Sequence, residues 1–569
     1  MLTPRQVRYG GLAGSLLLAA AGFLGGVRVP WRSGVLPLHF FAGRYGVLLP
    51  ICWVAGTALL IGAWWSGRRV VTTLRWAYVT AGLWLLPMLL PAVLGSRDTF
   101  SYACQGSVVA GGHDPYTAGP GELGCPWADA TSPTWRDAPA PYGPVFVVLA
   151  GLAARLGGSL AGTLGWLRLI AVLGVLLVAC CLPVLARRSG VAPERAGWLF
   201  LACPLVAVHL ISGAHNDALM VGLLVAGLAV VAGGRRNDVA AGGQAGWAAL
   251  LAGGALLGLA VGVKGTAVVV LPFAALLAAR PPAARLPAAR PPVGSPPAGS
   301  PSAARLPAGR PPAGSPPAAR LLAGRPPVGS LPAARLSGGP AAGGPAWLPG
   351  LLRGVAVVGG AVASLAAVSV GSGLGLGWVS ALSRSGDSVQ WTSVPTAVGM
   401  TMDYLGRPFG LDLDAVPVTR VIGVLVLAVV LIGLCWWAWR RGEPLLGAGL
   451  ALAATVALAP VFHPWYATWP LAVLAATWNR AGAVWWLLVP CAVASALALP
   501  DGTNLALATK LPGAALVTVL AAVLTVRAVR SVRAVRSVRP GAGSRPDSAA
   551  GRDAMERGGG QGHGGDGEI

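Results

Sequence analysis

Long apolar stretches separated by short polar turns dominate this chain, and they limit what it can fold into. Runs such as 11–26, 47–65, 170–186 and 421–437 are long enough to cross a hydrocarbon layer about 30 Å thick. Only 11% of the 569 residues are charged, whereas a soluble protein carries roughly 25%. Because backbone groups in lipid must be satisfied within their own segment, we expect an all-α polytopic membrane protein.

The net charge of +23 does not indicate a nucleic-acid partner. Eight arginines lie in one repeat tract at 280–335, another run fills the C-terminal tail, and most others flank apolar spans. That distribution is typical of charge that sets membrane topology, so we expect the bilayer as a partner. The eight cysteines show no CxxC or Cys/His spacing, so the sequence predicts no metal site.

The short apolar segment 145–156 decides the predicted topology. It is too short to span, and if it did span, every later basic turn would fall outside the cell. We therefore expect it to form a helix at the outer interface. The positive-inside rule then predicts about 14 spans in the cell membrane, with both termini cytoplasmic.

The predicted organisation has six parts, which follow from the apolar runs and two low-complexity segments. They are residues 1–94 with spans one to three, 95–163 with an outer loop and the interfacial helix, 164–279 with spans four to eight, 280–346 as a disordered Arg/Pro-rich cytoplasmic linker, 347–527 with spans nine to fourteen and an outer loop at 371–419, and 528–569 as a disordered basic and Gly-rich cytoplasmic tail.

Polar side chains gather at the predicted outer face, where five features are candidates for chemistry. Each has a plainer interpretation: a helix-end charge for Asp98 beside Arg97, an ordinary polar turn, a snorkelling lysine, or an aromatic belt. Together, however, aromatic faces suit sugars, cations suit a phosphate, and a carboxylate can act as a base. The features are Ser96–Tyr102 with the loop that follows, Ser212–Asp217, Lys264, His463–Tyr466 and the loop with Arg384.

A series of motifs in this order resembles the actinobacterial polyprenol-phosphomannose-dependent α-1,6-mannosyltransferases, which are GT-C glycosyltransferases. The resemblance covers about 44–499 and leaves out the Arg/Pro tract and the tail. The motifs are RDTFSYACQG, GGHDPYTAGP, WRDAPAPYGPVF, SGAHNDALMVGL, VKGTA–LPF, TSVPTAVG and FHPWYATWPL.

The resemblance implies a GT-C fold with a long first outer loop that is catalytic. It also implies a reaction in which mannose passes from a polyprenyl phosphate to a lipid-anchored mannan of the lipomannan type, with inversion and formation of an α-1,6 linkage. Asp98 is then the expected general base. Cations are expected at the donor phosphate, and other polar or aromatic residues at the sugar or the acceptor. The expected phosphate contacts are Arg97, Lys264, Arg384 and His463; the expected sugar or acceptor contacts are Tyr102, Asp114, His215, Asn216, Asp217, Trp465 and Tyr466.

Elementary chemistry agrees with a single base. Polyprenyl phosphate leaves without an acid, whereas the 6-hydroxyl of the acceptor needs a base. A monophosphate can be held by cations alone, so no metal or other cofactor is expected. The adjacent Arg97 is expected to lower the pKa of Asp98 and to keep it ionised.

Two cysteines, Cys104 and Cys125, fall in the predicted outer loop. Because that compartment is not reducing, we expect a disulfide between them. A transferase that uses another polyprenyl-phosphosugar or linkage stays an alternative, since nothing in the sequence reads the stereochemistry of the sugar. A lipid or sugar transporter fits less well, because the polar residues gather on one side and few lie at mid-span positions.

Overall fold

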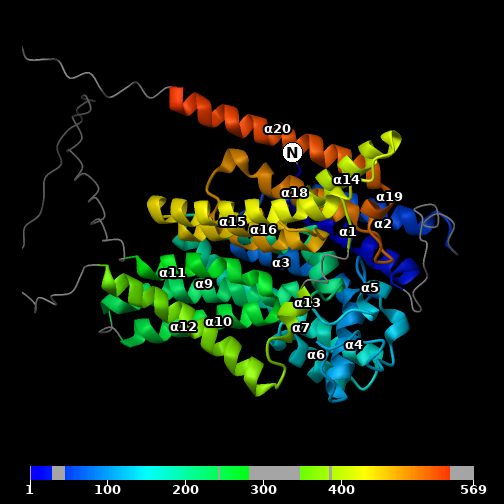
Figure 1. Ribbon diagram of the computed structural model, residues 1–569, viewed down its shortest axis with the longest axis horizontal. Coiled ribbons are helices and arrows are strands. Elements are labelled where there is room, and N and C mark those ends of the chain that lie inside the picture. Colours follow the sequence, from blue (N-terminus) through cyan, green and yellow to red (C-terminus); the bar gives the residue numbers. More distant parts are fainter. Residues whose placement is uncertain (1, 28–44, 241–243, 281–346, 383–387, 538–569) are drawn as a thin grey trace, which may run out of the picture.

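The computed structural model describes residues 2–27, 45–240, 244–280, 347–382 and 388–537. In these ranges the regular structure is helical, with one isolated two-residue bridge, so the prediction of an all-α protein is confirmed. Long helices run side by side across Figure 1, and the short helices α4 to α6 gather at one end of the bundle. The predictions for the Arg/Pro-rich tract and for the end of the tail lie outside the described residues.

The N-terminal block holds α1, α2, α3 and the 3-10 helix η2. Where α1 and α2 cross, Gly14 and Gly56 meet: a Cβ built on either one lies 2.9 Å from the other's carbonyl oxygen. Small residues allow this close approach of two helices in lipid. The bounds are Pro4–Gly25, Leu48–Gly67, Leu74–Leu85 and Leu86–Leu89.

The third span, predicted to complete the part at 1–94, is shorter than expected. Helix α3 ends at Leu85, η2 ends at Leu89, and the chain then runs without regular structure to Arg97. Pro87 and Pro91 explain the break, because proline supplies no amide donor and clashes with the preceding turn.

The segment between α3 and α7 is folded around two helices, α4 (Asp98–Ala110) and α6 (Pro144–Gly157). Gly106 of α4 lies directly against the backbone of Ala150 in α6, where a larger residue has no room. Helix α6 confirms the predicted helix at 145–156. Helix α4 was not predicted, since the sequence placed Asp98 in an outer loop, whereas this residue begins a helix of its own. Two short helices complete the segment: η3 (Ala128–Ala130) and α5 (Pro133–Arg136).

The central block contains a large share of the buried apolar residues. Helices α8 and η4 form a pair bent by 67°, and the break between them contains Pro204. The members are α7 (Leu160–Arg188), α8 (Pro193–Leu201), the π-helix η4 (Val206–Ser212), α9 (Asp217–Ala240), α10 (Gln244–Val263), η5 (Gly265–Val270) and α11 (Leu271–Ala279).

The C-terminal block packs α14 against α15 and α20, and α16 against α17. Helix α20 continues to Ser537, so the prediction of disorder from residue 528 is wrong for its first ten residues. The members are α12 (Leu348–Gly371), α13 (Gly377–Ala381), α14 (Val394–Gly406), η7 (Arg407–Phe409), α15 (Ala415–Arg441), α16 (Pro444–Leu458), η8 (Pro464–Ala467), α17 (Thr468–Thr477), η9 (Ala481–Ala483), α18 (Trp485–Leu497), α19 (Leu505–Ala508) and α20 (Lys510–Ser537).

Eight helices among the described residues are long and apolar enough to cross a membrane, or nine if the bent pair is one span. They are α1, α2, α7, α9, α10, α12, α15 and α20. A polytopic membrane protein is thereby confirmed. The count of about 14 is not, because several predicted spans correspond to helices of fewer than 18 residues, among them α3, α16, α17 and α18.

Candidate active site

The candidate site forms where segments far apart in the sequence meet. The start of α4, the turn between η4 and α9, and the junction of α10 with η5 supply its charged groups. Side chains from η8 and α17 cover them with aromatic rings. Because no one helix provides the whole site, its geometry depends on how the bundle packs.

The turn after η4 holds a strained backbone. Ala214 has φ +46°, a left-handed conformation that costs a residue with a Cβ about 1–2 kcal/mol. The turn is held by the hydroxyl of Thr99, which donates to the carbonyl of Gly213, and by the guanidinium of Arg168, which donates to the carbonyl of Ser212 at 3.1 Å. Such strain persists where surrounding contacts impose it, and it is common at functional sites.

Asp98 is the first residue of α4, and 14% of its side chain is exposed. Burial raises the pKa of its carboxyl to about 6, although the nearby Lys264 opposes the shift and hydrogen bonds from Ser96 and Trp135 do the same. The carboxyl is therefore still mostly ionised at neutral pH, but it accepts a proton far more readily than an exposed aspartate does. Raised carboxyl pKa values of this kind are typical of groups that exchange protons.

Arg97 does not contribute to this state, which corrects the expectation that it lowers the pKa of Asp98. Its guanidinium donates to the carbonyl of Ala130 at 3.4 Å, and its electrostatic partner is Asp501. Adjacent side chains at a helix start point in different directions. Although Arg97 is next to Asp98 in the sequence, its guanidinium therefore does not contact the Asp98 carboxylate.

His215 lies between two carboxylates. Its Nδ1 atom is 3.8 Å from Oδ2 of Asp98 and 4.0 Å from Oδ2 of Asp217. The ring is fully buried, and burial lowers its pKa well below the ordinary value, with nearby positive groups adding to the effect. The imidazole is therefore neutral, and its two nitrogens have different roles.

Asp217 is completely buried and forms an ion pair with Lys264. The ammonium group is 2.9 Å from Oδ1 and 3.1 Å from Oδ2 of the carboxylate, and the indole of Trp469 donates to Oδ1 at 2.5 Å. Lys264 also lies 4.5 Å from the ring centre of Tyr466 and 5.1 Å from that of Trp469. A lysine held by a carboxylate and two aromatic faces is a fixed positive charge.

Aromatic rings form the cover of the site. Trp465 lies between two histidines, with ring centres 4.0 Å from His215 and 4.7 Å from His463, and the His463 ring is parallel to it. Tyr466 stacks on Trp469 at 4.3 Å. Both stacks come from η8 and the start of α17, so this short segment orders one side of the site.

Tyr102 supplies the opposite side. Its hydroxyl is 3.4 Å from Nδ1 of His215 and 3.4 Å from the side-chain oxygen of Asn216, to which it donates. Its ring packs edge-on against Tyr142 at 5.2 Å and Phe146 at 4.8 Å. Because Tyr102 follows Asp98 by four residues, both lie on one face of α4.

Most of the described residues singled out in the sequence come together, and two do not. The structure brings together Asp98, Tyr102, His215, Asn216, Asp217, Lys264, His463, Trp465 and Tyr466. Arg97 points to another neighbour, and Asp114 is exposed and caps a turn by accepting the amide hydrogen of Tyr116. Arg384 lies outside the described residues.

Several members of the site were not predicted from the sequence. Tyr142 belongs to the quoted APAPYGP run, and Trp469 follows Trp465 by one helical turn, so both carried a signal. Arg168 and His209 did not, because nothing in an apolar span shows which side faces the turn. Among the residues that the structure describes, no group of three or more His, Cys, Asp or Glu side chains is arranged to hold a metal ion.

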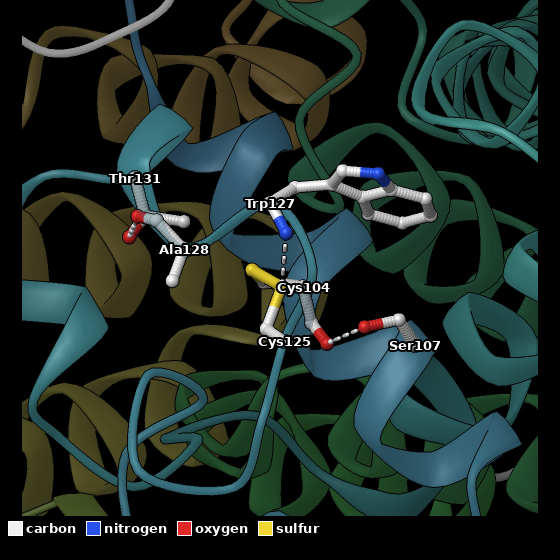
Figure 2. Close-up of a disulfide and its surroundings, with 6 residues drawn as sticks. All are labelled: Cys104, Ser107, Cys125, Trp127, Ala128 and Thr131. Atoms are coloured by element: carbon white, nitrogen blue, oxygen red, sulfur yellow. Dashed lines mark hydrogen bonds between the residues drawn. A yellow bond between two sulfur atoms is a disulfide. The ribbon is translucent and has the colours of Figure 1, made fainter.

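A disulfide between Cys104 and Cys125 ties α4 to the loop that follows it (Figure 2). The amide of Trp127 donates to the sulfur of Cys125 at 3.2 Å, and the hydroxyl of Ser107 donates to the carbonyl of Cys104 at 2.9 Å. The same loop carries the carbonyl that binds Arg97. The bond therefore joins the loop to the helix that begins with Asp98.

We expect removal of this disulfide to destabilise the protein. The variant with both Cys104→Ser and Cys125→Ser should unfold more easily by about 3 kcal/mol, since the loop of 21 residues gains freedom in the unfolded state. Thermal unfolding in detergent, with and without reductant, measures the change. A double variant of Cys180 and Cys181, which are free, is the control. Equal stability of wild type and the Cys104/Cys125 variant would contradict a structural bond.

Comparison with known proteins matches most of the chain to one family. A family model described as "Alpha-(1->6)-mannopyranosyltransferase, N-terminal domain" matches residues 8–280, and one described as "MptB C-terminal domain" matches 395–527. The curated "Alpha-(1->6)-mannopyranosyltransferase A" of Mycobacterium tuberculosis is 32% identical over 484 residues, which are 82% of this chain and 79% of that protein.

Further relatives carry the same description. The "Alpha-(1->6)-mannopyranosyltransferase A" of Corynebacterium glutamicum is 28% identical over 78% of this chain and 83% of its own length. A "Probable alpha-(1->6)-mannopyranosyltransferase" of Mycolicibacterium smegmatis is 29% identical over 85% of this chain and 80% of its own length. No matching solved structure was found. The chain therefore belongs to the actinobacterial α-(1→6)-mannopyranosyltransferase family and is a membrane-embedded mannosyltransferase.

Proposed function

We propose that the protein transfers mannose from polyprenyl-phosphate-mannose to a lipid-anchored mannan and forms an α-1,6 linkage of a lipomannan-type envelope glycan. The fold is then of the GT-C type, with the active site on the extracytoplasmic side and both termini in the cytoplasm. The basic turns and the position of the polar cluster at one end of the helices support this sidedness. The oligomeric state does not enter the proposal.

Asp98 acts as the general base in this proposal. Its carboxylate takes the proton of the acceptor's 6-hydroxyl while the hydroxyl oxygen forms a bond to C1 of the mannose. The bond from C1 to the phosphate oxygen breaks, and its electron pair leaves with the phosphate. Attack on the face opposite the leaving group converts a β-linked donor into an α-linked product, so one carboxylate is sufficient.

Lys264 is the proposed cation for the donor phosphate, with His463 near it. The lysine is already held by Asp217, Tyr466 and Trp469, so it is preorganised and needs no rearrangement when negative charge develops. About 11% of its side chain is exposed. Trp465, Tyr466, Tyr102 and Asn216 are the proposed contacts of the sugar and the acceptor.

The observation that carries the proposal is the raised pKa of Asp98 beside a fixed lysine. The carboxyl titrates at about 6, and no cation is bonded to it directly among the described residues. A carboxylate with these properties is a stronger base than an exposed one, and it is ionised at neutral pH. Aromatic rings and a fixed cation beside it suit a sugar attached to a phosphate.

Product analysis with the purified protein tests the proposal. Radiolabelled polyprenyl-phosphate-mannose and a short α-1,6-mannoside should give a product one mannose longer that an α-1,6-mannosidase removes. Donors that carry glucose or arabinofuranose serve as matched controls. Transfer from one of these in place of mannose would establish the alternative, a related transferase with another sugar. Uptake into liposomes without any transfer would contradict the enzyme.

A further inference from the structure

We infer that His215 is a positioning residue that orients the carboxylate of Asp98 by donating a hydrogen bond from Nδ1. This inference rests on the proposed role of Asp98 as the base. It assigns His215 a task other than contact with the sugar or the acceptor. This role requires the hydrogen of the neutral ring to lie on Nδ1.

The Nδ1 atom is the nitrogen that faces the acceptors. It is 3.8 Å from Oδ2 of Asp98, 4.0 Å from Oδ2 of Asp217 and 3.4 Å from the hydroxyl of Tyr102. An ionised carboxylate can only accept hydrogen bonds. A bare nitrogen in this place would set lone pairs against lone pairs, so the hydrogen of the neutral ring belongs on Nδ1.

The other nitrogen supports the same assignment. Nε2 of His215 is buried and has no hydrogen-bond partner in the part of the chain that the structure describes. A buried donor without a partner is rarer than a buried acceptor without one, which favours an Nε2 that carries no hydrogen. Burial also holds the pKa of His215 well below its usual range, so only one nitrogen is protonated.

Asp98 is the carboxylate that can use this donor. Both oxygens of Asp217 are already taken by Lys264, and Trp469 donates to one of them. Asp98 has no direct cation, and a small movement of its side chain closes the 3.8 Å gap to a hydrogen bond. Substrate binding commonly shortens such long contacts.

The ring of His215 is fixed on several sides. Trp465 lies 4.0 Å from it, Tyr102 lies edge-on at 6.3 Å, and His209 is 5.7 Å away. The turn that carries it contains the strained Ala214. A ring held in this way can set the direction of a carboxylate, which an unconstrained side chain cannot.

Substitutions that keep or remove each ring nitrogen test the inference. An Asn amide can occupy about the position of Nδ1, a Gln amide reaches about the position of Nε2, and Leu supplies neither. We expect the rate of His215→Gln and His215→Leu to fall at pH 7. The acid limb of their rate profile should move up by about one pH unit, because the charged carboxylate loses a donor. His215→Asn should keep the limb near that of the wild type.

The other ionisable groups around Asp98 and His215 stay in place in every variant. They come from α4, the turn before α6, the middle of η4, the start of α9, the α10–η5 junction, and η8 with the residue before it. A shift of the limb is therefore assigned to position 215. These groups are Tyr102, Tyr142, His209, Asp217, Lys264, His463 and Tyr466.

The readouts are kcat and KM for donor and acceptor between about pH 5 and pH 8, with thermal unfolding as a check on folding. Equal limbs in the Asn and Gln variants would overturn the inference, and so would a rise in KM with the limb unmoved. If the Leu variant fails to fold, the comparison of the Asn and Gln variants still tests the role of His215. If Asp98→Asn is active in the same series, Asp98 is not the base. If Asp98→Asn is inactive and the acid limb of His215→Gln does not move, only the proposed role of His215 is refuted.

Discussion

The substitution Asp98→Asn should lower the rate of mannosyl transfer by about 10²- to 10⁴-fold, the usual contribution of a general base. Asn keeps the size of the side chain and removes the acceptor of the proton. The fold should persist, because the amide of residue 98 still donates to Ser96 and Thr99 still holds Gly213. Transfer of labelled mannose by purified protein measures the loss.

The matched control for this variant is Asp129→Asn. Asp129 is exposed, lies in the same segment between α3 and α7, and its charge acts on Arg136 and not on Asp98. It should retain the wild-type rate. The pH profile adds a second check: a base acts only when unprotonated, so the wild-type rate should fall as pH drops through about 6. Residual activity of Asp98→Asn should lack this limb, and a normal rate in that variant would exclude Asp98 as the base.

The second large effect concerns the buried ion pair of Asp217 and Lys264. Lys264→Met alone should destabilise the protein by about 3–5 kcal/mol, because it leaves a fully buried carboxylate without its cation. Transfer should also be lost, since the fixed charge proposed for the donor phosphate is gone. Thermal unfolding in detergent and product formation measure the two effects.

The double variant Asp217→Asn with Lys264→Met separates these effects. Asn keeps an acceptor for the indole of Trp469 while both charges disappear, so stability should return close to that of the wild type. Activity should remain low. A double variant that is fully active would contradict a role for Lys264 at the phosphate, and a single variant as stable as wild type would contradict the buried pair.

The sequence was most informative about features of the structure that depend on composition or on a local motif. Apolar runs with few charges predict a helical membrane protein however the helices pack, because backbone groups in lipid can form hydrogen bonds only within their own segment. The length of the segment 145–156 predicts a short helix, and α6 has those bounds within one residue at each end. The motifs also identified the family and most members of the site, since residues that follow one another in a turn, such as His215 to Asp217, stay together.

The tertiary structure alone decided which side chains meet and in what state. Lys264 pairs with a carboxylate 47 residues away, and that carboxylate also binds an indole 252 residues away. Arg97, next to Asp98 in sequence, faces Asp501 instead, and the burial that raises the pKa of Asp98 comes from segments that pack over it. Such contacts depend on how the helices cross and on the bend at η4. Because electrostatic energies depend on the distance between the charges, they cannot be predicted until the packing is known.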